Sequence, residues 1–411
     1  KNFNNPKKVG LKMSSRIILR RHLYQYPAYF KKHFTMKNYL LFLMAILCLN
    51  TFSAYGQGCV AIRGNSTCGT NFGNTVNLAK GEFNVQFGYR YFESFRHFRG
   101  AEEETNRIEE GTNVINDSHF LDLGLSYGIT DRWFANVILP YVSHKRSSMY
   151  EHGGNPPNGL GERHITTASG ISDIRFGIGY WLFEPGSKSY NYSLGVGVKL
   201  PTGSYDYTDT FYNQGDDKDQ DVETVVDQSI QPGDGGTGIT FDIQGFHALG
   251  SGFGISTNLY YLVNFQATNG VLTRNGSSEF SCPDQFAARI GASYGLENGL
   301  NFYLGGRTEG VTSSDLIGSS EGYRRPGYAI SVEPGIGYSM GNLSFFASVP
   351  VALYRNRIQS YSDKVRTADT GVYRHGDAAF ADYLINAGVS YRFGGKMDDH
   401  SMPKETIILE E

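Results

Sequence analysis

The sequence predicts an all-β fold, namely a closed antiparallel transmembrane β-barrel of about 12 strands with short periplasmic turns and long extracellular loops. Three observations support this prediction. Apolar residues alternate with glycine, polar or charged residues, and a period of two is typical of strands. Short and long connections take turns between the alternating segments, as in bacterial outer-membrane barrels. The ionisable residues within the segments fall on the face opposite the aliphatic residues.

The composition of the 411 residues agrees with a barrel. The formal net charge is -3 and the mean hydropathy is -0.35. This average is too polar for a helical membrane protein, but half of each barrel strand faces water. The 28 Tyr, 27 Phe and 51 Gly suit interfacial aromatic girdles, tight turns and small strand faces. The near-neutral charge gives no reason to expect a nucleic-acid partner.

The N-terminal part is expected to lie outside the barrel. Residues 1–35 are basic and aromatic without periodicity, and we interpret them as a non-native extension upstream of Met36. Residues 36–57 have the basic start, apolar run and small residues of a secretory signal peptide. Residues 58–80 then form either a periplasmic lead or a small plug, and the sequence leaves both alternatives open.

Two cysteines follow the predicted signal peptide. Cys59 and Cys68 are candidates for a disulfide in an oxidising periplasm. Cys59 could instead carry a lipid, but the residues before it lack the Leu of a lipobox. No clustered His accompanies the pair, which argues against zinc, and the sequence contains no c-type haem motif. We therefore expect no cofactor and no metal site.

The barrel is predicted to span residues 81–393. Its alternating segments, in chain order, are 81–95, 118–129, 133–142, 174–182, 192–200, 237–249, 252–265, 284–295, 300–307, 328–340, 343–354 and 381–393. Closure into a barrel removes the edges that these strands would otherwise expose. Aromatic residues near strand ends match two interfacial girdles, and they are Tyr127, Trp133, Tyr141, Tyr180, Tyr338, Tyr391 and Phe393. A polar tail, residues 394–411, follows the last segment.

Ten ionisable residues are predicted to face the lumen. They are Arg90, Asp122, Arg175, Lys199, Asp242, Arg289, Arg307, Glu333, Asp382 and Arg392. On the lipid face each Arg or Lys would cost about 2–4 kcal/mol at the midplane. They could filter a permeant solute or form salt-bridged rungs that fill a narrow lumen, and we favour rungs for most. Glu333 is the functional candidate, because the following Pro334 cannot join the ladder and could re-aim it.

One hairpin resembles a known family. The matching residues are Gly170, Ser172, Asp173, Arg175, Gly177, Tyr180, Gly195, Lys199, Pro201, Thr202 and Gly203. Over this stretch the chain is similar to outer-membrane proteins grouped as transporters of the meta-pathway of phenol degradation. The resemblance implies a barrel that passes small, often hydrophobic, molecules.

The loops and Ser118 offer weaker candidates. The acidic run 216–223 and the loop histidines His144, His152 and His164 could bind a cation, but dispersed residues of this kind are more often solvated surface. Ser118 and His119 are neighbours on a strand and point to opposite faces, so they predict no catalytic dyad. No catalytic residue is expected.

The sequence therefore predicts a multi-pass barrel of the outer membrane that passively admits a small solute, hydrophobic solutes included. Its expected partners are outer-membrane lipid, the small-molecule solute and the outer-membrane assembly machinery. The alternative is a structural or partner-binding barrel with an occluded lumen. An outer-membrane lipid hydrolase is a third and less favoured hypothesis.

Overall fold

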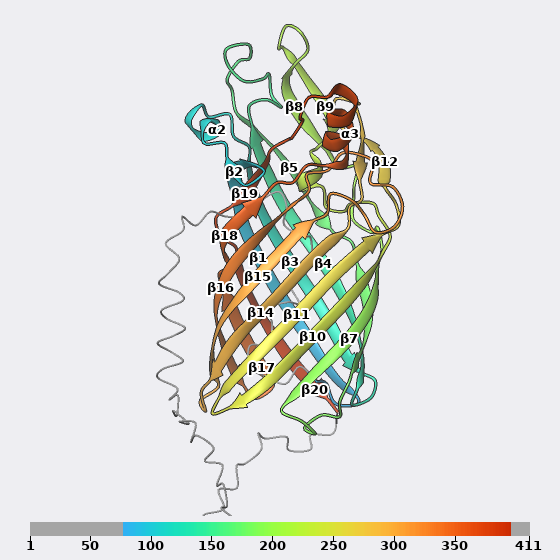
Figure 1. The fold of residues 1–411 in the computed structure, drawn as a ribbon, viewed down its shortest axis with the longest axis vertical. Helices are drawn as coiled ribbons and strands as arrows, with labels where there is room; N and C mark the ends of the chain where they lie inside the picture. The colour runs from blue at the N-terminus through green and yellow to red at the C-terminus, as the bar shows by residue number, and fades with distance from the viewer. Residues whose placement is uncertain (1–76, 396–411) are drawn as a thin grey trace, which may run out of the picture. The chain divides into compact units, whose positions relative to one another are not determined.

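The computed structural model describes residues 77–395, which form a closed barrel of twelve antiparallel strands (Figure 1). This confirms the predicted fold class and strand number. Several predicted features lie outside the described residues. They are the extension 1–35, the signal peptide 36–57, the pair Cys59 and Cys68, and most of the polar tail. No helix within residues 77–395 is long and apolar enough to cross a membrane.

Nine wall positions are each occupied by one continuous strand. These strands are β1 (Glu82–Arg99), β3 (Ile115–Gly128), β4 (Trp133–Ser148), β7 (Tyr190–Lys199), β10 (Gly238–Gly250), β11 (Phe253–Asn264), β14 (Gln285–Gly295), β15 (Leu300–Val311) and β16 (Gly327–Met340). Sequential strands pair in antiparallel register around most of the wall, because each alternating segment folds back on the one before it.

The three remaining wall positions are each shared by two strand segments in line. The pairs are β5 (His164–Ile171) with β6 (Arg175–Trp181), β17 (Leu343–Ser348) with β18 (Val351–Asn356), and β19 (Ala378–Ala381) with β20 (Ile385–Gly394). The first pair lies against β4, the second against β16 and the third against β1. Pairing of β1 with β20, and of β15 with β16, completes the closed wall.

The two ends of the barrel differ in their connections. Short turns gather at one end, and the other end carries small elements within long loops (Figure 1). These loop elements are β2 (Glu102–Glu103), α2 (Asn106–Glu109), β8 (Thr208–Gln214), β9 (Gln220–Val225), η2 (Gln228–Ile230), β12 (Thr268–Leu272), β13 (Glu279–Ser281) and α3 (Tyr361–Thr370). By the usual layout of such barrels the short turns face the periplasm. We call that end the lower end.

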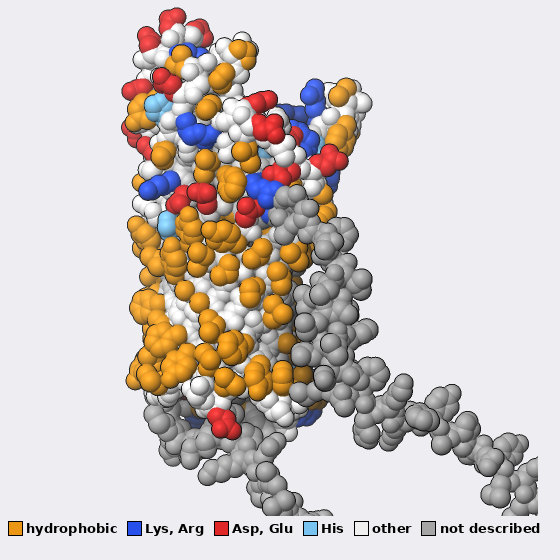
Figure 2. Space-filling view, turned by 90° about the vertical axis from the view of Figure 1, so that its left-hand side faces the viewer, with side chains coloured by type: hydrophobic (Ala, Val, Ile, Leu, Met, Phe, Trp, Pro, Cys, Tyr) orange, Lys and Arg blue, Asp and Glu red, His pale blue; other side chains and the backbone are white. Residues whose placement is uncertain are grey.

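The outer wall carries a band of apolar side chains between charged ends (Figure 2). Phe87 and Ile290 are each 58% exposed, and Phe241 is 52% exposed. Such exposure of large apolar side chains is stable against lipid rather than water. Near the lower end, aromatic rings pair across strands, as Trp133 and Tyr180 do with centroids 4.7 Å apart. This agrees with an interfacial girdle.

The upper ends of several strands and loops differ from the sequence prediction. β4 and β5 extend into the predicted loop between residues 143 and 170, because their pairing continues beyond the apolar band. Helix α3 was not predicted, and a capping box between Ser360 and Asp363 marks its start. The predicted last segment is broken at Asp382, which lies between β19 and β20 rather than within a strand.

Candidate functional site

The predicted lumen charges mostly lie on the inner wall. Seven are buried, namely Arg90, Asp122, Arg175, Lys199, Arg289, Arg307 and Glu333. Asp242 and Arg392 are half-buried and line the lower lumen. Asp382 differs, because its side chain is 39% exposed in the break between β19 and β20, where Arg96 and Arg355 contact it at 2.9 and 3.2 Å. Asp382 therefore lies in a break of the strand predicted over residues 381–393, and its place among the lumen-facing residues stays a prediction.

A charged layer crosses the lumen. Glu309 on β15 accepts from Arg307 at 2.6 Å and lies 3.9 Å from Arg90 on β1, a strand that is not its neighbour in the wall. The guanidinium of Arg90 also lies 4.3 Å from the ring centroid of Phe120. Sequence reasoning missed Glu309 because the predicted strand ended at Arg307. Extending the alternation by one period would have found it.

Glu333 is held firmly in this part of the lumen. Its side chain is fully buried, with Arg289 at 2.7 Å and the hydroxyl of Ser348 donating at 2.7 Å. Pro334 lies opposite the break between β17 and β18, and its carbonyl accepts from Val349 at 3.0 Å. The irregularity next to Glu333 is therefore in the facing strand, and β16 continues through Pro334.

Residues 226–237, which we call the inner loop, fold inward between β9 and β10. Asp227 accepts two hydrogen bonds from Arg325, at 2.8 and 2.7 Å, and lies 3.7 Å from Arg146. Burial alone would raise the pKa of Asp227, but the two guanidinium groups outweigh burial and hold the pKa well below its usual range. This contact, the upper anchor, joins loops that are far apart in the sequence.

A second contact, the lower anchor, fixes the other end of the inner loop. Lys199 on β7 forms ion pairs with Asp234 of the inner loop and with Asp173, the latter at 3.7 Å. The Asp173 carboxylate also accepts from the backbone N–H groups of Asp234 and Gly203, both at 3.1 Å. All three charged side chains are buried. A buried carboxylate is stable here because cation and N–H donors surround it.

The lower anchor uses the residues that carry the family resemblance. Ser172 donates to the carbonyl of Pro232 in the inner loop at 2.5 Å, and Thr202 donates to the carbonyl of Ser172 at 3.0 Å. A Cβ at Gly203 would lie 2.9 Å from Gly233, so the two backbones need glycine to approach. The residues of the family resemblance therefore interrupt the strand between β5 and β6, and at this interruption they bind the inner loop.

Two cavities lie inside the barrel on either side of the charged layer. The upper cavity, about 70 Å³, is lined by Phe92 and Phe120 of the wall and by Gln228 and Asp234 of the inner loop. The lower cavity, about 120 Å³, lies among residues of the lower strands, and the buried Leu78 lies at its wall. The two cavities share no lining residue.

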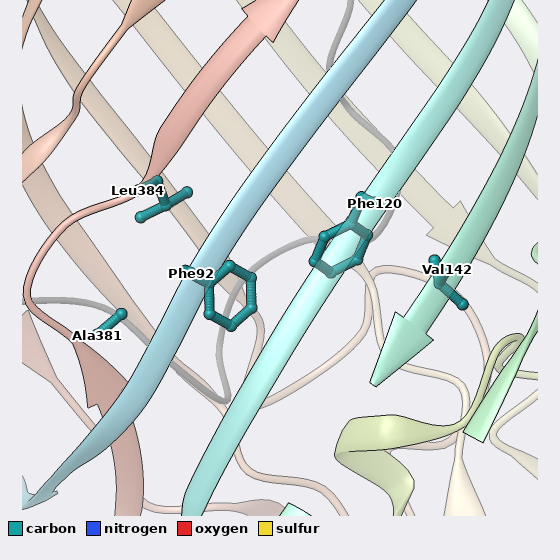
Figure 3. Packing of buried hydrophobic residues seen from close by; sticks show 5 residues of the cluster. All are labelled: Phe92, Phe120, Val142, Ala381 and Leu384. Carbon is teal, nitrogen blue, oxygen red and sulfur yellow. The ribbon is translucent and has the colours of Figure 1, made fainter. Parts of the chain in front are cut away.

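An apolar patch forms one wall of the upper part of the lumen. Phe92 on β1 and Phe120 on β3 stack with ring centroids 5.6 Å apart (Figure 3). Val142 lies beside them on β4, and Ala381 and Leu384 continue the patch at the break between β19 and β20. All five side chains are buried. The upper part of the lumen therefore has an apolar side.

The weaker sequence candidates are placed as follows. His152 contacts His164 with tilted rings, 5.2 Å between centroids, whereas His144 is buried elsewhere on the inner wall. Within residues 77–395 no group of three or more His, Cys, Asp or Glu is arranged to hold a metal. Ser118 is buried in the upper cavity, but His119 is on the outer wall, where it contacts Asp117 at 2.9 Å. Ser118 and His119 therefore form no dyad.

The comparisons with known proteins agree with this architecture. Residues 73–235 match the model of a family described as "Putative MetA-pathway of phenol degradation". No curated protein sequence matches the chain. The crystal structure of an outer-membrane channel from Pseudomonas putida F1 covers 81% of this chain and 100% of its own, with a TM-score of 0.52 and 11% identity.

Two further solved structures have lower TM-scores. The β domain of the Bordetella autotransporter BrkA covers 77% of this chain and 100% of its own, with a TM-score of 0.41 and 16% identity. The toluene transporter TodX of P. putida covers 84% of this chain and 99% of its own, with a TM-score of 0.38 and 11% identity. The fold places the chain among bacterial outer-membrane β-barrels, and residues 73–235 are similar to the phenol-degradation family.

Proposed function

We propose that this outer-membrane barrel is a channel that passively admits a small, largely apolar solute. The proposal rests on one observation, the pair of cavities inside the lumen. Unfilled space of this kind distinguishes a channel from a small barrel whose interior is filled by side chains. The upper cavity, with Phe92 and Phe120 in its wall, combines apolar surface with polar groups as small-molecule sites usually do.

The lower cavity supports a small solute. Its volume of about 120 Å³ is close to that of an engineered cavity of roughly 150 Å³ that holds benzene. Its lining is mostly polar, with Arg175, Asn136 and Asp242 among the polar residues, whereas Phe134 and Ile138 contribute apolar surface. A molecule the size of a single ring is therefore a suitable solute for this space.

A structural or partner-binding role is the second candidate. The observation that favours it is the charged layer, in which Arg90 and Glu309 approach across the lumen to 3.9 Å. The inner loop and its two anchors add further side chains to the upper lumen. If these contacts never separate, the lumen is occluded and no solute passes. A lipid hydrolase has no comparable support from the placement of Ser118 and His119.

Liposome swelling with the purified protein tests the proposal. Vesicles that contain the barrel should admit a small neutral solute faster than protein-free vesicles, and planar bilayers should show discrete conductance steps. The folded barrel should first be verified by its heat-modifiable migration on a gel. A correctly folded barrel that gives neither swelling nor conductance would support the structural role instead.

A further inference from the structure

The loop between β15 and β16 presents two large aliphatic side chains at its tip. Leu316 is 70% exposed and Ile317 is 55% exposed. Leu316 is thus more exposed than Ile290 in the apolar band of the outer wall, which is 58% exposed. Two adjacent aliphatic side chains are unfavourable in water, because apolar area gains free energy when it leaves water. The position of the tip therefore decides which surroundings these side chains have.

Buried polar groups hold the tip in place. The Asp315 carboxylate accepts two hydrogen bonds from Arg324, at 2.7 and 2.6 Å, and a third from the backbone N–H of Asp284 at 2.9 Å. The N–H of Leu316 in turn donates to the Asp284 carboxylate at 2.9 Å. The side chains of Asp315 and Arg324 are both buried. Leu316 and Ile317 cannot fold inward without separating a buried ion pair, which is costly.

The tip lies beside the lipid-facing wall. A Cβ at Gly318 of the tip would lie 3.7 Å from the carbonyl oxygen of Phe265, which directly follows β11. Phe265 is 44% exposed, and Leu259 is exposed on the outer face of β11 below it. The Asp284 carboxylate that holds the tip also accepts from the N–H of Asn264, the last residue of β11, at 2.9 Å. In Figure 1 the loop, drawn in orange, passes beside the upper end of β11. The tip therefore continues the apolar outer wall upward.

The tip exposes no charged side chain. Residues 312–320 contain a single ionisable side chain, the Asp315 carboxylate, which is buried and paired with Arg324. The hairpin of β8 and β9 is different, because its acidic residues between 216 and 223 are exposed. A charged group resists entry into the acyl layer of a membrane, whereas an uncharged tip can enter it. The tip therefore suits an apolar medium, and the hairpin suits water.

We infer that Leu316 and Ile317 insert among the acyl chains of the outer leaflet, so that the loop between β15 and β16 is a lipid anchor outside the barrel wall. A second copy of the chain and a soluble partner are the competing occupants of the tip. The continuity of the tip with the lipid-facing wall favours acyl chains over both. The inference is independent of the proposed function, because it holds whether or not a solute passes the lumen.

A fluorescent probe on the tip tests the inference. Ile317→Cys in the full chain would be labelled with the environment-sensitive dye NBD and reconstituted in phosphatidylcholine vesicles at low protein density. Ile290→Cys, in the apolar band, is the lipid-exposed control, and Val222→Cys, in the acidic hairpin, is the water-exposed control. We expect the probe at Ile317 to emit at a shorter wavelength than the probe at Val222. Phosphatidylcholine with a doxyl quencher on its acyl chain should quench the probe at Ile317, as it quenches the probe at Ile290.

The depth of the probe and a second position sharpen the test. Because the tip lies at the upper edge of the wall, a doxyl group on carbon 5 of the acyl chain should quench the probe at Ile317 more than a doxyl group on carbon 12. Leu316→Cys should give the same result, and it replaces Ile317→Cys if that variant lacks the heat-modifiable migration of a folded barrel. The wild type, treated with the same dye, corrects for labelling of the native cysteines.

Two results would overturn the inference. In the first, the probes at Ile317 and Leu316 emit as the probe at Val222 does, and aqueous iodide quenches them while doxyl lipid does not. In the second, they emit at a short wavelength that neither quencher changes, so that protein rather than lipid covers the tip. If that emission returns to a longer wavelength when the vesicles are fused with further lipid, the covering protein is a second copy of the chain.

Discussion

The upper and lower halves of the lumen are stabilised in different ways. In the upper half, buried ion pairs such as Asp227–Arg325 and Lys199–Asp234 join segments that are distant in the sequence. In the lower half, glycines such as Gly124 alternate with polar side chains such as Gln86 and Gln244, and all of them belong to strands of the wall. Contacts to the inner loop therefore restrict the upper half, whereas strands of the wall supply almost the whole lining of the lower half.

This difference predicts which substitutions change permeability and why. The ion pairs of the anchors can separate without breaking the hydrogen bonds between the strands. The inner loop can then move while the cylindrical wall keeps its shape. The width of the lower wall is set by strand number and tilt, and its ion pair between Arg392 and Glu82, at 4.0 Å, joins the neighbouring strands β20 and β1. We therefore expect large effects from the two anchors and small effects from the lower cavity.

The largest effect is expected from the lower anchor. Lys199→Met removes the ammonium group that lies between Asp173 and Asp234. Loss of one partner from a buried ion pair typically costs about 3–5 kcal/mol, and here two buried carboxylates are left facing each other. The inner loop should leave its position, so conductance in planar bilayers should rise and the folded barrel should become less heat-stable.

Lys188→Met is the control for this variant, because Lys188 is exposed in a turn at the lower end. It should change neither conductance nor heat stability. If Lys199→Met conducts as the wild type does and keeps its heat stability, the lower anchor does not restrict the lumen.

The upper anchor should give a smaller effect of the same sign. Asp227→Asn keeps an acceptor for Arg325 but removes the negative charge. A hydrogen bond to a charged group contributes about 1.5–3 kcal/mol to the free energy of unfolding, and the variant should lose a contribution of this size. Conductance at pH 7 should rise, though less than in the Lys199 variant. Asp221→Asn, on the exposed hairpin of β8 and β9, is the control.

The pH dependence of the wild type follows from the same anchor. The folded pKa of Asp227 is lower than its unfolded value of about 3.9. Its stabilising contribution is therefore complete above that value and is lost only as the pH falls through the lower, folded pKa. Between pH 8 and pH 5 the wild-type conductance should not respond to Asp227. A transition near pH 6 that disappears in Asp227→Asn would contradict this assignment.

The wall could be predicted from the sequence because its signal is local. Alternation at a period of two identifies each strand and also assigns Arg90 and Arg175 to the face opposite the aliphatic residues. The fold followed from these segments, since most strands pair with their neighbours in the chain. The extent of the strands above the membrane was missed, because pairing between β4 and β5 continues where the apolar pattern has ended.

The anchors could not be predicted because their signal is not local. Nothing in the residues around Asp227 indicates that Arg325, 98 positions later, is its partner. The resemblance did single out Asp173 and Lys199, but the sequence alone gave them no common partner. That partner, Asp234, lies in a loop without hydrophobic periodicity, so the sequence does not indicate which residues the loop contacts. The alternation that identifies strands therefore does not predict ion pairs between distant loops.

Glu333 tests whether the charged layer acts as a filter as well as a support. Glu333→Gln preserves the shape but leaves Arg289 without its carboxylate. The lumen then gains positive charge, so the zero-current potential across a KCl gradient should shift toward anion preference. Glu297→Gln, in the exposed lower turn between β14 and β15, is the control. An unchanged potential in Glu333→Gln would restrict Glu333 to a structural role.

The smallest effect is expected in the lower cavity. A Cβ at Gly124 would meet its nearest neighbour, Gln86, at 3.8 Å, so Gly124→Leu adds volume to the cavity without a backbone clash. Replacing a strand glycine changes stability by about 1 kcal/mol or less, and the added side chain should slow solute entry in liposome swelling. Leu123→Val, on the lipid face of the same strand, should leave the rate unchanged. Equal rates in both variants would mean that the lower cavity is not on the solute's path.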